Sequence, residues 1–217
     1  VAEDTVRFFK VDRKKVHIIH NPLVIDQVKS ESNEHVHHPW LLDKKEPVLV
    51  SVGRLSEQKD FPTLIQAFAK TLNKKRCKLL ILGEGPNYNK LIALCKKLSI
   101  EDHVDFLGFK KNPYKYVKQS DLFVLSSKWE GFGMVFIEAL AVGTPIVATD
   151  CSGGPREILN DGEFGSLVPI ENVDKLSDAI IKALDKKIDK DKLIRRAMDF
   201  DIANIKRHYE EVFDAIY

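Results

Sequence analysis

Short apolar runs rich in β-branched residues alternate with amphipathic stretches along most of this 217-residue chain. The first such run, PVLVSVG at 47–53, precedes a stretch over 61–72 whose apolar residues recur at helical spacing. The same alternation predicts further strands at 78–83, 104–109, 121–126, 146–149 and 166–169, and further helices at 88–98, 114–118, 133–142, 155–159 and 174–184. Because the strand runs are continuously apolar, we expect helices to cover both faces of a parallel sheet. The sequence therefore predicts an α/β fold, a Rossmann-like doubly wound parallel sheet.

Segments at both ends do not follow this alternation. Residues 1–21 are expected to form a helix end and then a strand over Val16–His20, and the polar, proline-bearing residues 22–46 are typical of a linker or irregular insert. Residues 201–217 predict a separate helix. One face of that helix is apolar and comprises Ile205, Tyr209, Val212, Phe213 and Ile216. We expect this face to pack on a neighbouring domain, and the chain, which starts at Val1, to be part of a longer protein.

The amino-acid composition limits the kinds of molecule that this chain can be expected to bind. The net charge of +2 leaves no electrostatic footprint for nucleic acid. Lysine clusters at 74–76, 96–97 and 186–192 are interpreted as solvated faces, with weak peripheral contact to anionic lipid as the minority interpretation. Three widely spaced cysteines indicate a reducing compartment without a disulfide framework, and no apolar run approaches 18 residues. We expect a cytoplasmic protein that can lie peripherally at the inner face of the membrane.

The segment SSKWEGFGMVFIEALAVGTPIVATD, residues 126–150, carries two carboxylates eight positions apart. Gly131 and Gly133 break regular structure, and MVFIEALAV favours a helix that begins near Gly133. Glu130 then lies in the loop before the helix and Glu138 lies inside it. Free backbone amides of Gly133, Met134 and Val135 would form an anion site at the positive end of the helix dipole. An anion site between two carboxylates suits a ligand with phosphate and hydroxyl groups, such as a nucleotide-sugar.

Three further loops follow predicted strands and should meet at the same edge of the sheet. In residues 53–59, Gly53 permits close backbone approach, and Arg54 and Lys59 are cations suited to a diphosphate. The alternative for this loop is a structural salt bridge for Arg54 and a solvated Lys59. Residues 83–86 (GEGP) are interpreted as a tight turn, although Glu84 can line the cleft, and residues 108–113 are interpreted as an ordinary loop.

A histidine cluster, His35, His37 and His38, suggests a metal site. However, no cysteine lies nearby and the spacing suits no standard zinc site. We therefore interpret these residues as part of a surface loop and expect no metal.

Taken together, these segments resemble the C-terminal half of a glycosyltransferase family 4 enzyme, which has the two-domain GT-B architecture. The matching pieces are SVGRLSEQKDFPTLIQAF (51–68), LLILGEGPNYNKL (79–91), VDFLGF (104–109), QSDLFVLSS (119–127), EGFGMVFIEALAVGTPIVATD (130–150) and GPREIL (154–159). Glu130 and Glu138 match the E-x7-E motif of that family. The resemblance implies a remnant of the N-terminal domain and crossover at 1–21, a donor-binding domain at 22–200, and a helix at 201–217 that packs on the N-terminal domain.

The resemblance also implies roles for individual residues in a retaining transfer from a nucleoside-diphosphate sugar. Arg54 and Lys59, which follow Gly53, would bind the diphosphate, and Glu138 would bind the ribose diol. Glu130 and the amides of Phe132, Gly133 and Met134 would contact the donor sugar and phosphates, with Val135 in the same turn. The loop at Phe109 would face the base. Glu130, Arg54 and Lys59 are thus the expected catalytic residues, without a cofactor or metal.

Residues 151–159, CSGGPREIL, resemble a subgroup that builds bacterial surface polysaccharides or lipid-linked glycans from UDP-linked hexoses or N-acetylhexosamines. One departure from the family is Asp60, where many members have glycine; aspartate is a good helix cap. Two alternatives stay open. A nucleotide-sugar epimerase shares the GT-B architecture, although the E-x7-E segment argues against it. The other alternative is that this chain alone is a nucleotide-sugar binding module without turnover, because the acceptor and the catalytic cleft need the N-terminal domain.

Overall fold

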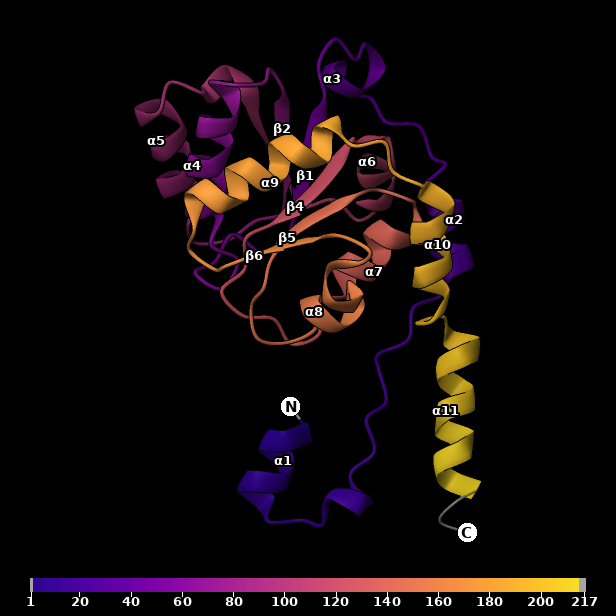
Figure 1. Ribbon diagram of the computed structural model, residues 1–217. Coiled ribbons are helices and arrows are strands. Elements are labelled where there is room, and N and C mark those ends of the chain that lie inside the picture. Colours follow the sequence, from indigo (N-terminus) through magenta and orange to yellow (C-terminus); the bar gives the residue numbers. More distant parts are fainter. Residues whose placement is uncertain (1, 215–217) are drawn as a thin grey trace.

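Six parallel strands form one sheet in the computed structural model, which describes residues 2–214, with side chains from residue 6 onward (Figure 1). The strands are β1 (Val48–Val52), β2 (Lys78–Leu82), β3 (Val104–Gly108), β4 (Leu122–Leu125), β5 (Ile146–Thr149) and β6 (Ser166–Val168). Their order, β3-β2-β1-β4-β5-β6, is that of a doubly wound Rossmann sheet. The predicted fold class is confirmed, and every strand lies within one residue of its predicted bounds.

Helices follow the strands as the alternation predicts. They are α4 (Phe61–Leu72), α5 (Tyr88–Lys97), α6 (Tyr114–Gln119), α7 (Met134–Ala141), α8 (Pro155–Ile158) and α9 (Val173–Asp185), with single 3-10 turns at Glu101–His103 and Asn160–Gly162. Strand side chains alternate between two cores. Val48 and Val50 pack with α2, α6, α7 and α10 on one face, whereas Leu49 packs with α4, α5 and α9 on the other. Both faces are therefore buried, as the continuous apolar strands require.

Residues 22–46 do not form the expected linker. They contain α2 (Ile25–Glu31) and α3 (Pro39–Leu42), and Ile25, Val28, Val36 and Leu41 are buried in the core beside α7. The linker prediction was wrong because these few apolar residues are separated by polar ones, yet all of them face the sheet domain.

The histidine cluster is only partly at the surface. His35 and His37 are exposed, but His38 is buried, and its Nδ1 accepts a hydrogen bond from the Trp40 amide at the start of α3. Nε2 of His38 lies 3.2 Å from Asp105 Oδ2. The surface-loop interpretation was thus wrong for His38, which caps a helix and joins it to β3.

The two ends of the chain project from the sheet domain (Figure 1). Helix α1 (Ala2–Phe9) precedes a 3-10 turn, Arg13–Lys15, but residues 16–20 are extended and form no strand with any described residue, so the predicted strand was wrong. Helix α10 (Lys190–Met198), which the sequence did not predict, leads into α11 (Ile202–Asp214). Residues 215–217, including Ile216, lie outside the described part.

Exposure distinguishes α11 from the domain helices. Ile205 is buried, whereas Tyr209 and Phe213 of the same predicted apolar face are exposed, as are Phe8 and Phe9 of α1. Within residues 2–214, no helix combines the length and apolar character needed to cross a membrane.

Candidate functional site

The loops that follow β1, β2 and β3 contact one another closely at the carboxyl edge of the sheet. Gly83 has φ +139°, and a Cβ on it would lie 2.0 Å from the Gly53 carbonyl oxygen. The Gly83 amide donates to Gly108 O at 2.9 Å, and the Leu55 amide donates to Glu84 O at 2.8 Å. The tight turn lies later than predicted: residues 83–85 are irregular, and the turn begins at Gly85, whose carbonyl accepts from the Tyr88 amide at 3.2 Å. Gly83 instead lets two loops touch.

A cavity of about 520 Å³ opens where these loops meet. Its wall includes Gly53, Arg54, Glu84, Phe109 and Tyr114. The Phe109 ring is 70% exposed, while its amide donates to Glu84 Oε1 at 3.3 Å. Three predicted donor residues, Gly53, Arg54 and Phe109, thus share one cavity, and Glu84 lines it as expected.

Arg54 and Lys59 differ in their surroundings. Arg54 is exposed and has no ion pair with any described residue, so the structural salt bridge considered for it is absent there. Nζ of Lys59 lies 2.7 Å from Glu130 Oε1, and the two side chains are only 14% and 5% exposed. The alternative of a solvated Lys59 was therefore wrong. The Lys59 stem passes over Gly53: a Cβ on Gly53 would lie 3.2 Å from Lys59 Cε. Since Gly53 lines the cavity, the ion pair lies next to it.

Glu130 has a second partner that the sequence did not single out. The Ser127 hydroxyl donates to Glu130 Oε1 at 2.6 Å, and Thr149 donates to the Ser127 carbonyl at 2.6 Å. Glu130 therefore bonds to a cation and to the hydroxyl of Ser127, whose backbone carbonyl is held by Thr149 at the end of β5. A lysine ammonium has three donors, so Lys59 can bond to Glu130 and still donate to an anion.

The start of α7 has the geometry expected of an anion site. Gly133 caps the helix at φ +89°, and a Cβ there would lie 2.7 Å from the Phe136 ring, so only glycine fits without strain. Within residues 2–214, no oxygen accepts from the amides of Gly133, Met134 and Val135. These free donors at the positive helix end follow directly after Glu130 in the chain.

Glu138 lies one turn further along α7. Burial raises the pKa of its carboxyl to about 7. Burial, and then the charge of Glu138, raise the pKa of Tyr114, a residue of the cavity wall. Glu138 is thus close enough to the cavity to act on its wall, and it is poised between its neutral and ionised forms near neutral pH.

The CSGGPREIL loop supports the Glu130 loop from behind. A Cβ on Gly153 would lie 2.2 Å from Glu130 O, and one on Gly154 would lie 1.8 Å from Phe132 O. The Glu130 amide also donates to Ser152 O at 2.9 Å. This segment therefore holds the backbone that carries Glu130 and leads into α7.

Phe132 packs on residues that the sequence did not connect with the site. Its ring stacks on His20 at a centroid distance of 5.1 Å and meets Phe200 edge-on at 5.8 Å. His20 Nε2 lies 2.6 Å from Glu157 Oε1, although 137 residues separate them in sequence. The side chain of Phe132 thus anchors the loop to the segment before the domain, while its amide was the predicted donor contact. No sequence signal joins His20 to Glu157.

The backbone conformation of Asp60 explains why many members of the glycosyltransferase family have glycine at this position. It has φ +45°, the left-handed region that glycine and aspartate tolerate best. Its carboxylate accepts from the Thr63 hydroxyl at 2.7 Å. Asp60 is the N-cap residue of α4, as expected, but its side chain forms no capping bond to a backbone amide of the described helix. The Thr63 amide donates instead to the Asp60 carbonyl oxygen at 3.0 Å.

Comparison with known proteins identifies the family of this chain. The family model for glycosyl transferases group 1 matches residues 32–200. A Campylobacter jejuni relative, N-acetylgalactosamine-N,N'-diacetylbacillosaminyl-diphospho-undecaprenol 4-alpha-N-acetylgalactosaminyltransferase, is 36% identical over 94% of this chain and 55% of its own. N-acetyl-alpha-D-glucosaminyl L-malate synthase from Bacillus anthracis is 34% identical over 66% of this chain and 37% of its own. The chain thus spans about half, or less, of the relatives that it matches.

Solved structures show the same fold at lower identity. The lipopolysaccharide outer core galactosyltransferase WaaB superposes with a TM-score of 0.82 and 23% identity, covering 99% of this chain and 60% of that one. Anabaena HepE in complex with UDP-glucose superposes with a TM-score of 0.77 and 23% identity, covering 94% and 58%. The parallel sheet, the E-x7-E segment and the family match together lead to one conclusion: the chain belongs to the glycosyl transferases group 1 family.

Proposed function

We propose that this chain is the donor-binding half of a retaining glycosyltransferase that takes its sugar from a UDP-linked donor. The observation that carries the proposal is the meeting of the Lys59–Glu130 ion pair with the free amides at the start of α7. Because the Lys59 stem passes over Gly53 of the cavity wall, this cation, the carboxylate and the backbone donors would act together with Arg54 and Phe109, which line the cavity. This set fits a ligand with a diphosphate, hydroxyls and a base.

The departure of the nucleoside diphosphate is the step that these residues would assist. As the bond between the sugar and the diphosphate breaks, negative charge grows on the leaving phosphate oxygens. Arg54, Lys59 and the amides of Gly133 and Met134 would stabilise that charge without reorganising, because they are held in place before the reaction. We propose that these donors, without a metal ion, neutralise the leaving group.

Each of the remaining residues would bind a different part of the donor. The Glu138 carboxylate, when ionised, can accept from both hydroxyls of a ribose. Glu130, fixed by Ser127 and Lys59, would face the donor sugar. The base would lie in the cavity against Phe109, whose exposed ring offers a stacking surface.

The acceptor would bind mainly to the other half of the protein. Relatives of this chain are about twice its length, and the name of the Campylobacter jejuni relative describes a transferase that acts on an undecaprenol-linked acceptor. We propose a glycan or lipid-linked acceptor and a hexosyl or N-acetylhexosaminyl donor. The exposed aromatic residues of α1 and α11, Phe8, Tyr209 and Phe213, would pack on the N-terminal domain. Alone, the described half would bind the donor without turnover.

Calorimetry with UDP and with inorganic pyrophosphate tests the site. We expect Arg54→Ala to weaken both ligands about tenfold, because a charge-assisted hydrogen bond is lost. Glu138→Ala should weaken UDP and leave pyrophosphate unchanged, since only UDP carries a ribose. Arg76→Ala, at an exposed arginine far from the cavity, is the charge-matched control. Unchanged UDP binding in the Arg54 variant would contradict the diphosphate assignment.

Turnover is tested separately on the full-length protein. A UDP-sugar incubated with the full-length enzyme and a lipid-linked acceptor should give a product with the anomeric configuration of the donor, read by NMR. Inversion of that configuration would contradict the retaining assignment, and UDP binding without transfer to any acceptor would favour the binding module.

A further inference from the structure

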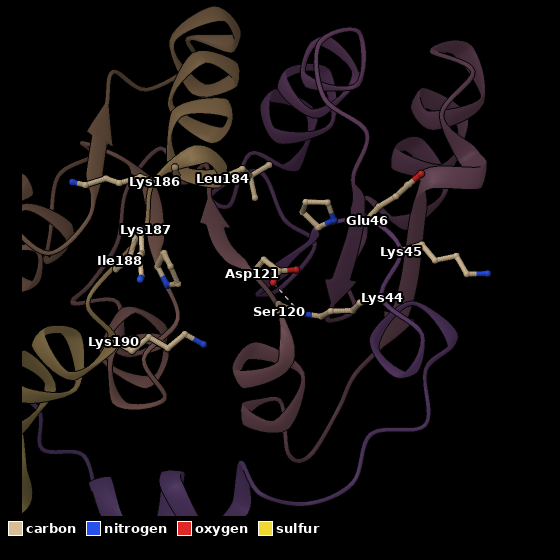
Figure 2. A pocket seen from close by; sticks show the side chains of 13 residues that line it. Lys44, Lys45, Glu46, Ser120, Asp121, Leu184, Lys186, Lys187, Ile188 and Lys190 are labelled. Atoms are coloured by element: carbon tan, nitrogen blue, oxygen red, sulfur yellow. Dashed lines mark hydrogen bonds and ion pairs between the residues drawn. The ribbon is translucent and has the colours of Figure 1, made fainter.

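A second charged cavity lies at the opposite edge of the sheet, where strands β1, β4 and β5 begin. Its volume is about 670 Å³. Pro47, Asp121 and Pro145, at the starts of these strands, form one side, and the connection between α9 and α10 forms the other (Figure 2). The same strands end at the carboxyl edge, beside the donor site. A ligand in this amino-edge cavity is therefore separated from that site by the length of a strand.

Lysines dominate the charge of the amino-edge cavity. Five lysines line it, namely Lys44, Lys45, Lys186, Lys187 and Lys190, against two acidic residues, Glu46 and Asp121. Figure 2 shows Lys190 extending toward Asp121 from the α10 side, and Lys44 extending toward Asp121 from the strand side. Lys45 and Lys186 point away from the centre (Figure 2). The two walls thus present ammonium groups to the same space.

The acidic residues of the wall already have partners. Asp121 accepts from Lys44 Nζ at 2.9 Å and from the Val48 amide at 2.8 Å. Glu46 Oε1 lies 3.0 Å from Arg76 Nε. Its Oε2 is buried without a partner among the described residues, and in Figure 2 the Glu46 carboxylate points away from Lys187 and Lys190.

Neighbouring carboxylates on the α9–α10 connection are also engaged. Asp185 pairs with Lys75, and Asp189 caps α10 through the Lys192 amide and lies 3.7 Å from Arg195. Within the described chain, Lys187 and Lys190 consequently have no ion pair. Their mutual repulsion, with the neighbouring Lys186, would be relieved by a bound anion.

Apolar residues form part of the wall of this cavity. Pro47, Pro145, Leu184 and Ile188 line it together with the lysines. Lysine, a compact cation on a flexible stem, suits phosphate groups of varied geometry.

We propose that the amino-edge cavity binds a ligand that carries a phosphate or diphosphate group, at a site separate from the donor site. Lys187 and Lys190 would hold the anion from one wall, while Lys44 stays paired with Asp121 on the other. The phosphate can belong to a small free anion or to a lipid head group. The proposal does not depend on what binds at the carboxyl edge, because no residue is shared by the two sites.

The test uses inorganic pyrophosphate with the full-length protein at low ionic strength, in an Arg54→Ala background that weakens the donor site. Calorimetry would compare that background with the added pair Lys187→Gln/Lys190→Gln. The pair Lys96→Gln/Lys97→Gln, at two exposed lysines of α5, is the charge-matched control. We expect a loss of about tenfold for the cavity pair, from two weak charge contacts, and no change for the control.

A second arm distinguishes the two sources of phosphate. Cosedimentation with vesicles of phosphatidylcholine and phosphatidic acid, against phosphatidylcholine alone, measures binding to a lipid head group. If the Lys187→Gln/Lys190→Gln variant binds pyrophosphate more weakly, the ligand is a free anion. If the variant loses binding only to the anionic vesicles, the ligand is a lipid head group. If the cavity pair behaves like the control with both probes, the proposal is overturned. UDP affinity should be the same in the cavity pair and in the protein with native lysines at these positions.

Discussion

The two edges of one sheet use the same residue type in opposite ways. At the carboxyl edge, Lys59 is 14% exposed and bonded to Glu130, which is 5% exposed. At the amino edge, Lys187 and Lys190 are exposed and have no ion pair within residues 2–214. A buried, paired charge is part of the fold, whereas an exposed, unpaired charge is available to a ligand without affecting folding.

The loops at the two edges explain why their lysines differ in burial. Glycines 53, 83, 153 and 154 let the carboxyl-edge loops touch, and a Cβ on the last three would lie within 2.2 Å of a carbonyl oxygen. These contacts exclude water from Lys59 and Glu130. The α9–α10 connection, residues 186–189, contains no glycine, and Lys186, Lys187 and Asp189 within it are exposed. The following variants test this contrast, from the largest expected effect to the smallest.

Removal of Lys59 should have the largest effect. Lys59→Met keeps most of the side-chain volume but leaves Glu130 buried without its cation, which we expect to lower the free energy of unfolding by about 3–5 kcal/mol. The double variant Lys59→Met/Glu130→Gln should recover most of that loss, because no buried charge remains. Urea unfolding measures both, with Lys187→Met as the exposed control. A double variant as unstable as the single one would show that pairing is not the cause.

Glu138 should make stability depend on pH. Burial raises its folded pKa from 4.5 to about 7, so the folded state binds more protons than the unfolded state between these values, and stability falls as pH rises through that window. Glu138→Gln removes this penalty. The variant should match the parent near pH 4 and exceed it by about 3 kcal/mol above pH 7. Urea unfolding at both pH values checks this, and a gain independent of pH would contradict it.

Two glycines of one loop provide a matched pair. Gly133→Ala places a Cβ at φ +89° and 2.7 Å from the Phe136 ring, and we expect it to cost about 1–2 kcal/mol. Gly131→Ala meets no atom within 4 Å and should change stability by less than about 0.5 kcal/mol. Thermal unfolding of the two variants measures the difference. Equal losses would mean that the start of α7 does not require glycine.

The amino edge should show the smallest effect. Lys187→Gln/Lys190→Gln removes two charges without an ion pair, so the free energy of unfolding should change by less than about 0.5 kcal/mol. Urea unfolding at low and high salt checks this expectation. If the free energy of unfolding fell by more than about 1 kcal/mol, these lysines would stabilise the fold. The two edges would then not differ in this respect.

Regular elements could be predicted because their signals are local. Most strands of the sheet are largely apolar runs, although β3 contains Asp105, and Gly133 followed by helix-forming residues marks the start of α7. The exceptions lacked such a signal: Val16–His20 has the composition of a strand but no neighbouring strand to pair with. Likewise, α2 and α10 are short amphipathic segments whose few apolar residues are separated by charged ones.

The sequence by itself determined the strands, the helix starts and the residue types that could bind a nucleotide-sugar, because period, propensity and glycine placement act within a few residues. Only the tertiary structure decided which of them meet. Lys59 and Glu130 are 71 residues apart, and His20 and Glu157 are 137 apart. Burial also raised the pKa of Glu138, which the helix alone could not do. Contacts and burial of this kind depend on how whole elements pack, and no local pattern specifies them.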